Sequence, residues 1–164
     1  MRGFWVVVLL ALLSLGADWP QYQGPGHDGI SSEKGLAKLW PSEGPRVDWT
    51  VKVGEGFAGP AVAGGEVFLL DREEDERGVM RCIDLKTGQE KWRRSFDAPG
   101  RLSYNGSRST PAVTEKFVYA VGPFGDVYAV DRKTGKAVWT VSLQKDYNSK
   151  PPGFGYGQSP LVYE

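Results

Sequence analysis

One short pattern occurs twice in this chain, and it constrains the fold more than any other feature of the sequence. Both copies keep the spacing of an Asp, a Thr, a Gly and a Trp, and they lie 47 residues apart, counted from Asp84 to Asp131. A repeat period of this length is typical of propellers and repeat arrays, in which each copy forms one supersecondary unit. The repeated residues are Asp84, Thr87, Gly88 and Trp92 in the first copy and Asp131, Thr134, Gly135 and Trp139 in the second.

Each copy predicts a β-hairpin. An apolar run ends at the Asp, a short polar step reaches Thr-Gly, and a second β-prone run contains the Trp. The Asp side chain can accept backbone N–H bonds in the turn, and Gly can adopt the positive φ that the turn requires. We therefore expect strands at 79–84 and 91–96 in the first copy and at 127–131 and 137–141 in the second.

Two further strands precede each hairpin. A Pro-Ala-Val sequence opens both units, at 60–62 and 111–113, and an apolar run follows at 66–70 and 117–121. Each unit thus supplies four short strands with turn signals between them. This is the content of one propeller blade.

The repeats predict an all-β fold, a β-propeller of four-stranded antiparallel blades. We expect one blade at 59–96, a second at 109–143 and the start of a third at 157–164. A blade of this kind takes about 40–50 residues and the smallest closed ring has about four blades. The 164 residues are therefore expected to form an incomplete propeller, a fragment of a ring.

A structural role explains the Trp of each copy. A blade is an open antiparallel sheet whose faces must pack against neighbouring blades. A Trp on the outer strand supplies a large flat surface for that contact, and its indole N–H can reach a backbone carbonyl of the next blade. We therefore assign the repeated residues to a structural repeat motif and give none of them a catalytic role.

The pattern Ala-x-Asp-x-x-Thr-Gly-Lys-x-x-Trp resembles the tryptophan-docking repeat of pyrroloquinoline quinone (PQQ) proteins. Residues 129–139 match it fully, and the earlier copy departs from it only at Cys82 and Gln89. Residues 19–25 and 154–162 also resemble segments of secreted PQQ-like propeller repeat proteins, so the likeness extends over nearly all of the chain after residue 17. The resemblance implies the fold but not the cofactor, because many proteins of this kind bind none.

The first 17 residues predict an export signal. Arg2 is followed by an apolar run at 4–15, and the small residues Gly16 and Ala17 suit a cleavage site. The run is too short for an ordinary transmembrane helix, although an uncleaved anchor is the alternative. No Cys follows the run, so no lipid anchor is expected. We expect a periplasmic or secreted protein without a membrane span after cleavage.

The next two segments are expected to pack against the propeller. Residues 18–45 predict an extended N-terminal segment anchored by Trp19 and Trp40. Residues 46–53 contain Trp49 and resemble the second strand of the repeated hairpin without the hairpin itself. We expect an orphan outer strand there, one that completes a blade whose other strands come from elsewhere in the ring.

Charge and single reactive residues exclude several kinds of site. Lys plus Arg equals Asp plus Glu, at 20 each, so no basic excess indicates a nucleic-acid partner. His27 is the only histidine, and one His beside one Asp makes a poor metal site, so we expect a loop residue and no metal. The acidic run at 71–77 lacks the ligand spacing of a calcium loop and is expected at a solvated hairpin tip. Cys82 is expected to be a buried free thiol.

Two loops carry the candidate ligand contacts. Each loop precedes an innermost strand, and in a propeller that place is the mouth of the central channel, where ligands usually bind. An Arg there could pair with an anionic group, whereas aromatic and amide side chains could stack or hydrogen-bond; alternatively, these groups satisfy the loop backbone. The candidates are Tyr104, Arg108, Tyr156 and Gln158.

Three functional hypotheses follow. The first is an exported, non-catalytic PQQ-like propeller that binds a protein or a small molecule at its channel. The second is a PQQ-dependent alcohol or sugar dehydrogenase, for which further blades would have to supply the PQQ and calcium site. The third is a subunit of outer-membrane protein assembly that binds partners by strand addition. The missing lipidation Cys counts against the third.

Overall fold

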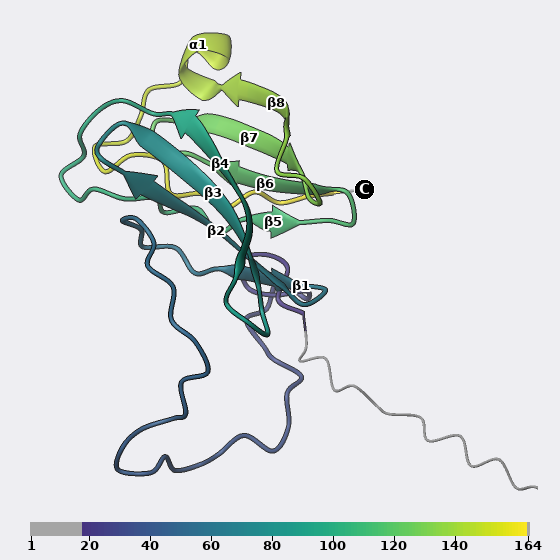
Figure 1. The fold of residues 1–164 in the computed structure, drawn as a ribbon. Helices are drawn as coiled ribbons and strands as arrows, with labels where there is room; N and C mark the ends of the chain where they lie inside the picture. Colours follow the sequence, from purple (N-terminus) through teal and green to yellow (C-terminus); the bar gives the residue numbers. More distant parts are fainter. Residues whose placement is uncertain (1–17, 164) are drawn as a thin grey trace, which may run out of the picture.

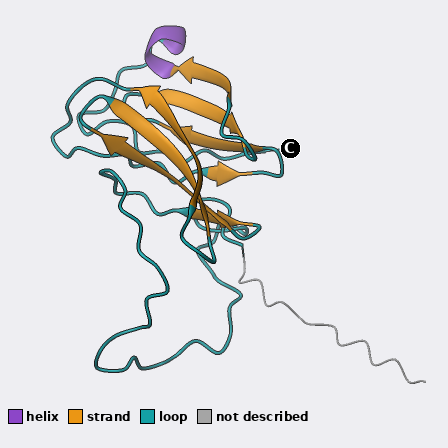
Figure 2. Cartoon of the chain, viewed as in Figure 1, coloured by secondary structure: helices purple, strands orange, loops and turns teal. Residues whose placement is uncertain are grey.

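The computed structural model describes residues 18–163, and its regular secondary structure consists almost entirely of two four-stranded antiparallel sheets (Figures 1 and 2). In each sheet the strands follow one another in sequence order. The first sheet contains β1 (Ala61–Ala63), β2 (Glu66–Glu73), β3 (Arg77–Asp84) and β4 (Glu90–Asp97). The second contains β5 (Ala112–Val113), β6 (Phe117–Val121), β7 (Asp126–Asp131) and β8 (Ala137–Ser142).

These sheets confirm the prediction of four-stranded antiparallel blades, and the two described sheets do not close into a ring. A short helix, α1 (Leu143–Tyr147), follows β8. The export signal predicted at 1–17 lies outside the described residues. Within the described residues, no helix has the length and apolar character needed to cross a membrane.

The core lies between the two sheets. Successive residues of a strand point to opposite faces, so every second residue can face the same neighbour. The facing side chains form one buried cluster. Within it, the rings of Phe96 and Tyr128 stack with their centroids 3.9 Å apart. The cluster contains Ala63, Phe68, Leu70, Met80, Cys82 and Phe96 from the first sheet and Val118, Ala120, Tyr128 and Val130 from the second.

The two Asp-x-x-Thr-Gly turns have the same internal bonds. Asp84 Oδ1 accepts bonds from the backbone N–H and the hydroxyl of Thr87, both at 2.8 Å. Asp131 Oδ1 accepts the same pair from Thr134, at 2.8 and 2.7 Å. Gly at the end of each turn has positive φ, 71° at Gly88 and 67° at Gly135. The shared Asp, Thr and Gly residues therefore build the same turn at the same edge of each sheet.

A Trp ring lies on each of these turns. Trp92 of the first sheet donates its indole N–H to the carbonyl of Arg132 at 2.9 Å, and a Cβ on Gly135 would lie 2.6 Å from the ring. Trp49 makes the corresponding contacts with the first turn, donating to the carbonyl of Leu85 at 2.9 Å and covering Gly88. Each turn thus offers a carbonyl and a bare glycine face to an indole from another part of the chain.

The segments outside the blades differ from several expectations. Residues 46–53 form no strand hydrogen bonds, although Trp49 is placed as an outer-strand Trp would be. Trp19 pairs with Val62 of β1 through two backbone bonds of 2.7 and 2.9 Å, which anchors the N-terminal segment. Trp40 does not anchor it, because its side chain is 65% exposed.

The prediction of a solvated tip at 71–77 is wrong for its first two residues. β2 continues to Glu73, and both Asp71 and Arg72 are only 1% exposed. Only Glu74, Asp75 and Glu76 separate β2 from β3. Asp71 and Arg72 lie inside because each has buried bonding partners, as the next section describes.

Substitution of Gly135 tests the contact between the sheets. Gly135→Ala should lower the free energy of unfolding by about 3 kcal/mol. The positive φ of this position is unfavourable for Ala, and the new methyl group displaces the Trp92 ring. Gly29→Ala is the matched control, since Gly29 has a similar φ of 71° with nothing within 4 Å of its added Cβ. That control should cost about 1 kcal/mol in urea denaturation. Equal losses in the two variants would contradict the role given to the contact.

The turns also predict acid sensitivity. Hydrogen bonds from Thr87 and Thr134 hold the pKa of Asp84 and of Asp131 below its ordinary value. A carboxyl whose pKa is lower in the folded state stabilises above the unfolded pKa, and this contribution is lost as the pH falls through the folded pKa. We expect the melting temperature to fall below about pH 4.

Removing the two Thr hydroxyls should weaken that fall. In the double variant Thr87→Val and Thr134→Val, the melting temperature should depend less on pH over the same acid range, because the carboxyl pKa values return toward those of the unfolded chain. Thr50→Val, at an exposed position, is the control and should leave the pH profile unchanged. A double variant with an unaltered profile would show that the turn bonds do not set these pKa values.

Candidate functional site

Arg108 is the centre of the first candidate loop. Its guanidinium donates to the carbonyl of Gly106 at 3.0 Å and to the carbonyl of Tyr104. It also lies 5.5 Å from the centroid of the Phe57 ring, within cation–π range. The side chains of Tyr104 and Phe57 are exposed, at 64% and 65%. We call Phe57, Tyr104 and Arg108 the Arg108 cluster.

The other two candidates are placed differently from each other. Tyr156 is 6% exposed, and its hydroxyl donates to Ser149 Oγ at 2.7 Å. Its ring lies against Gly125, where an added Cβ would be 2.6 Å away, so the side chain packs the loop. Gln158 is exposed. The structure therefore groups Tyr104 with Arg108, while Tyr156 is engaged in loop packing.

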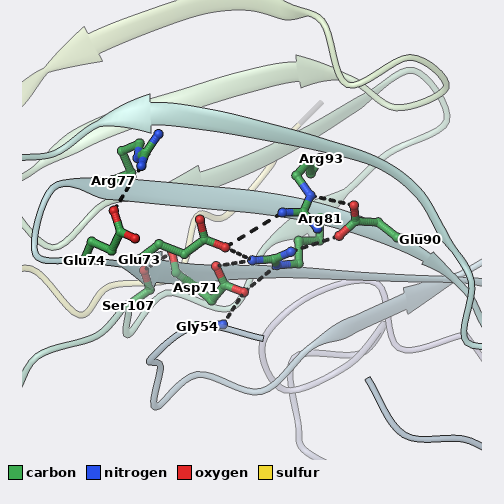
Figure 3. A network of polar contacts seen from close by, with 9 residues as sticks. All are labelled: Gly54, Asp71, Glu73, Glu74, Arg77, Arg81, Glu90, Arg93 and Ser107. Atoms are coloured by element: carbon green, nitrogen blue, oxygen red, sulfur yellow. Dashed lines mark hydrogen bonds and ion pairs between the residues drawn. The ribbon is translucent and has the colours of Figure 1, made fainter. Parts of the chain in front are cut away.

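The largest polar constellation was missed in the sequence. Arg81, in the middle of β3, is 2% exposed and is surrounded by three carboxylates (Figure 3). Its guanidinium lies 2.5 Å from Asp71, 2.5 Å from Glu73 and 2.9 Å from Glu90. Asp71 also accepts the backbone N–H of Gly54 at 3.0 Å, which ties the segment before β1 to the sheet.

A second buried guanidinium, that of Arg72, holds loops together. Its Nη2 donates to three backbone carbonyls, those of Asp75, Ala98 and Gly100, at 2.5–2.7 Å. Its Nη1 donates to Asn105 Oδ1 at 2.8 Å. Asn105 in turn donates to the Asp75 carboxylate. Arg72 thus connects the β2–β3 turn with the loop that leads into the second blade.

The surroundings set the protonation of these groups. Burial opposes the charge of Arg81, but the hydrogen bonds that it donates to three carboxylates outweigh burial and raise its pKa. Arg72 lacks such close carboxylates, so burial lowers its pKa. Burial raises the pKa of the Cys82 thiol to about 12. Cys82 is therefore a neutral thiol at pH 7, and a thiol needs the thiolate form to act as a nucleophile.

An open groove of about 940 Å³ lies beside the Arg81 constellation. Its lining carries both signs of charge, from side chains such as Lys52, Arg93, Glu55 and Glu74. The described residues contain no group of three or more His, Cys, Asp and Glu side chains placed to hold a metal. The groove is thus a charged surface suited to polar partners.

A sequence signal for this constellation exists, but it is weak. Arg81 and Asp71 occur within or directly after apolar strand runs, where a charge needs a buried partner. The two residues can be paired only when the register between β2 and β3 is known. That register places Asp71 opposite Val79, two residues from Arg81. Such cross-strand pairing cannot be read from spacing along the chain.

Breaking the Arg81 constellation should be strongly destabilising. Arg81→Met and Asp71→Asn should each cost about 3–5 kcal/mol, because each leaves buried charge uncompensated. The double variant should cost less than the sum of the two, as measured by urea denaturation. Arg77→Met is the control, since the ion pair of Arg77 with Glu74 is exposed and should contribute less than about 1 kcal/mol. Additive losses in the double variant would contradict the coupling.

Relatives of this chain are found among both curated proteins and solved structures. It is 32% identical over 137 residues to serine/threonine-protein kinase AfsK of Streptomyces griseus, which covers 82% of this chain and 15% of AfsK. It is 30% identical over 127 residues to quinoprotein alcohol dehydrogenase PedH of Pseudomonas putida, which covers 73% of this chain and 18% of PedH. The chain therefore spans less than a fifth of the length of either curated relative.

A solved structure and a family model define the fold and the family. The quinohemoprotein alcohol dehydrogenase of Comamonas testosteroni matches 90% of this chain and 22% of its own, with a TM-score of 0.58 at 19% identity, a likeness that shows the fold. The family model described as outer membrane protein assembly factor BamB matches residues 30–151. These matches confirm the resemblance found in the repeats: the chain belongs to the family of PQQ-like repeat propellers that this model describes.

Proposed function

We propose that this chain is part of an exported PQQ-like propeller that acts as a non-catalytic binding module. Its contact surface for a protein partner is the Arg108 cluster, at the ends of the loops that lead into the inner strands. Export rests on the sequence of residues 1–17, and the location we propose is the periplasm or the cell exterior. The family description, that of an assembly factor, supports a role in binding proteins.

The exposure of the Arg108 cluster carries this proposal. Two aromatic side chains, Phe57 and Tyr104, are each about two-thirds exposed around a single guanidinium. Aromatic residues and Arg are enriched at protein interfaces, and Tyr and Arg are enriched among the residues that dominate binding energy. Arg108 is already held by two loop carbonyls, so little conformational freedom is lost when a partner binds.

Site-specific crosslinking tests the proposal in the full-length protein within its own cells. A photoreactive phenylalanine at position 104 should form a discrete covalent adduct with a partner protein, and Arg108→Glu should abolish the adduct. The same probe at Glu115, an exposed residue at the other end of β5, should form no such adduct. An adduct that survives Arg108→Glu, or no adduct at position 104, would overturn the assignment of this surface.

The second candidate function is a PQQ-dependent alcohol dehydrogenase, favoured by the 30% identity to PedH. The two functions are distinguished by adding PQQ and Ca²⁺ to the purified full-length protein and measuring dye reduction with ethanol. The binding module predicts no alcohol-dependent dye reduction. Turnover with ethanol would establish the dehydrogenase in its place. A role in outer-membrane protein assembly is the remaining alternative, and the identity of the crosslinked partner would decide for or against it.

A further inference from the structure

The strands β7 and β8 build a small polar patch on one face of the second sheet. Their register places Asp126 opposite Ser142 and Tyr128 opposite Thr140. Alternate residues of a strand share a face, and directly opposite residues are neighbours across the ladder. These four side chains therefore form a two-by-two patch. The patch faces the first sheet, since the Tyr128 ring stacks on Phe96 of β4.

An open groove of about 540 Å³ separates this patch from the end of β4. We call it the seam groove, because residues of both sheets line it. Phe96 and Asp97 line it from the first sheet, and Gln144 and Lys145 from α1. The α1 wall is held in place, since Gln144 Nε2 donates to the carbonyl of Phe124 at 2.7 Å. Both walls belong to the two described sheets and their connections.

One buried hydroxyl in this groove lacks a partner. Tyr128 is 2% exposed, and its Oη has no hydrogen-bond partner among the described residues. A buried hydroxyl is normally hydrogen-bonded, so an orphaned one calls for an explanation. Gly122 leaves the space beside it open, because a Cβ there would lie 3.1 Å from the hydroxyl. The oxygen is itself buried, its proton and lone pairs are unused, and Tyr128 is one of the residues that line the groove.

Two carboxylates accompany the unpaired hydroxyl. Asp97 and Asp126 form none of the ion pairs found within 4.0 Å in residues 18–163. Burial raises the pKa of Tyr128, the charges of Asp126 and Asp97 raise it further, and the charge of Arg72 opposes them. The seam groove therefore offers strong acceptors, a phenolic hydroxyl and, from Lys145, a cationic donor.

The corresponding positions of the first blade do not repeat this arrangement. Cross-strand pairs place Val79 opposite Ser95 and Arg81 opposite Arg93 in that sheet. There the buried polar group, Arg81, is saturated by carboxylates of its own sheet. The unpaired polar groups are thus a property of the second blade and not of the repeat.

We propose that the seam groove binds a neutral polyhydroxylated molecule of monosaccharide size. Its volume falls within the range of about 300–1,000 Å³ typical of small-molecule sites. Sugar hydroxyls donate to Asp97 and Asp126, and sugar oxygens accept from Tyr128 and Lys145. A neutral ligand suits the lining better than a metal ion, because only two carboxylates are present and an ammonium group lies beside them. This inference is independent of the Arg108 cluster and of the proposed function.

Saturation-transfer NMR on the full-length protein tests this site. The probes are D-glucose, D-galactose, D-mannose and N-acetyl-D-glucosamine, each added separately at millimolar concentration. At least one should receive saturation from the protein. Tyr128→Phe and Asp126→Asn should each weaken its binding about fivefold or more, the loss typical of one hydrogen bond. Glu115→Gln, on a loop outside the groove, should leave the affinity unchanged.

A further variant guards against loss of folding. Asp97 is exposed, so Asp97→Asn should leave the melting temperature unchanged while still weakening sugar binding about fivefold. Absence of saturation transfer from all four sugars to the folded protein would overturn the proposal. Equal binding by wild-type protein and the three groove variants would also overturn it. A rise in melting temperature with Ca²⁺ that Asp126→Asn removes, without any sugar binding, would assign the groove to a cation instead.

Discussion

The contact between one Trp ring and the next Thr-Gly turn is the constraint on which the two-sheet arrangement depends. Trp92 has a single partner turn, and it uses both the carbonyl of Arg132 and the bare face of Gly135. The hydrogen bond fixes the direction of the indole ring, and the missing Cβ of Gly135 lets the ring approach the turn closely. Because the Asp131–Thr134 bonds shape that turn, the polar and apolar parts of the motif are required together. The same contact holds the two sheets at the distance at which the apolar side chains between them pack.

Two buried arginines, Arg72 and Arg81, and the partly buried Arg132 then join separate segments of the chain. Arg81 is compensated by three carboxylates, and Arg72 by backbone carbonyls and Asn105. Arg132 has both kinds of partner, a backbone carbonyl and a carboxylate. It donates to the carbonyl of Ala63 in the first sheet at 2.8 Å and lies 3.2 Å from Glu66. Each guanidinium has enough donors to join several segments at once. The loops around the candidate sites therefore take their shape from buried charge rather than from strand pairing.

The fold was largely predictable because the sequence pattern of a four-stranded blade occurs in two copies. Strand positions followed from alternation and turn residues, and the ends differ by up to three residues. β2 was expected at 66–70 and extends to Glu73, and β7 was expected from 127 and begins at Asp126. The wrong predictions concern whether charged side chains are buried or exposed. Asp71 and Arg72 look like the start of a charged tip, yet both are buried. Asp71 accepts a hydrogen bond from Arg81, and Arg72 donates one to Asn105. Of the Arg108 cluster, Tyr104 and Arg108 were predicted from the sequence. Phe57 was not, because it joins the cluster from another loop.

The comparison of the two blades shows where specificity can arise in such a fold. Position for position, the strands that carry Arg81 and Tyr128 are the same element, and both residues lie near the middle of the third strand. The repeat fixes the backbone there but leaves the side chain free, because the turn and the Trp contact do not involve that residue. In the first blade the position holds a saturated ion cluster, which stabilises a charged face. In the second it holds an unpaired hydroxyl beside a groove, which can accept a ligand. The motif residues that identify this family are therefore the ones that carry least information about what a given blade binds, and the residues between them carry most.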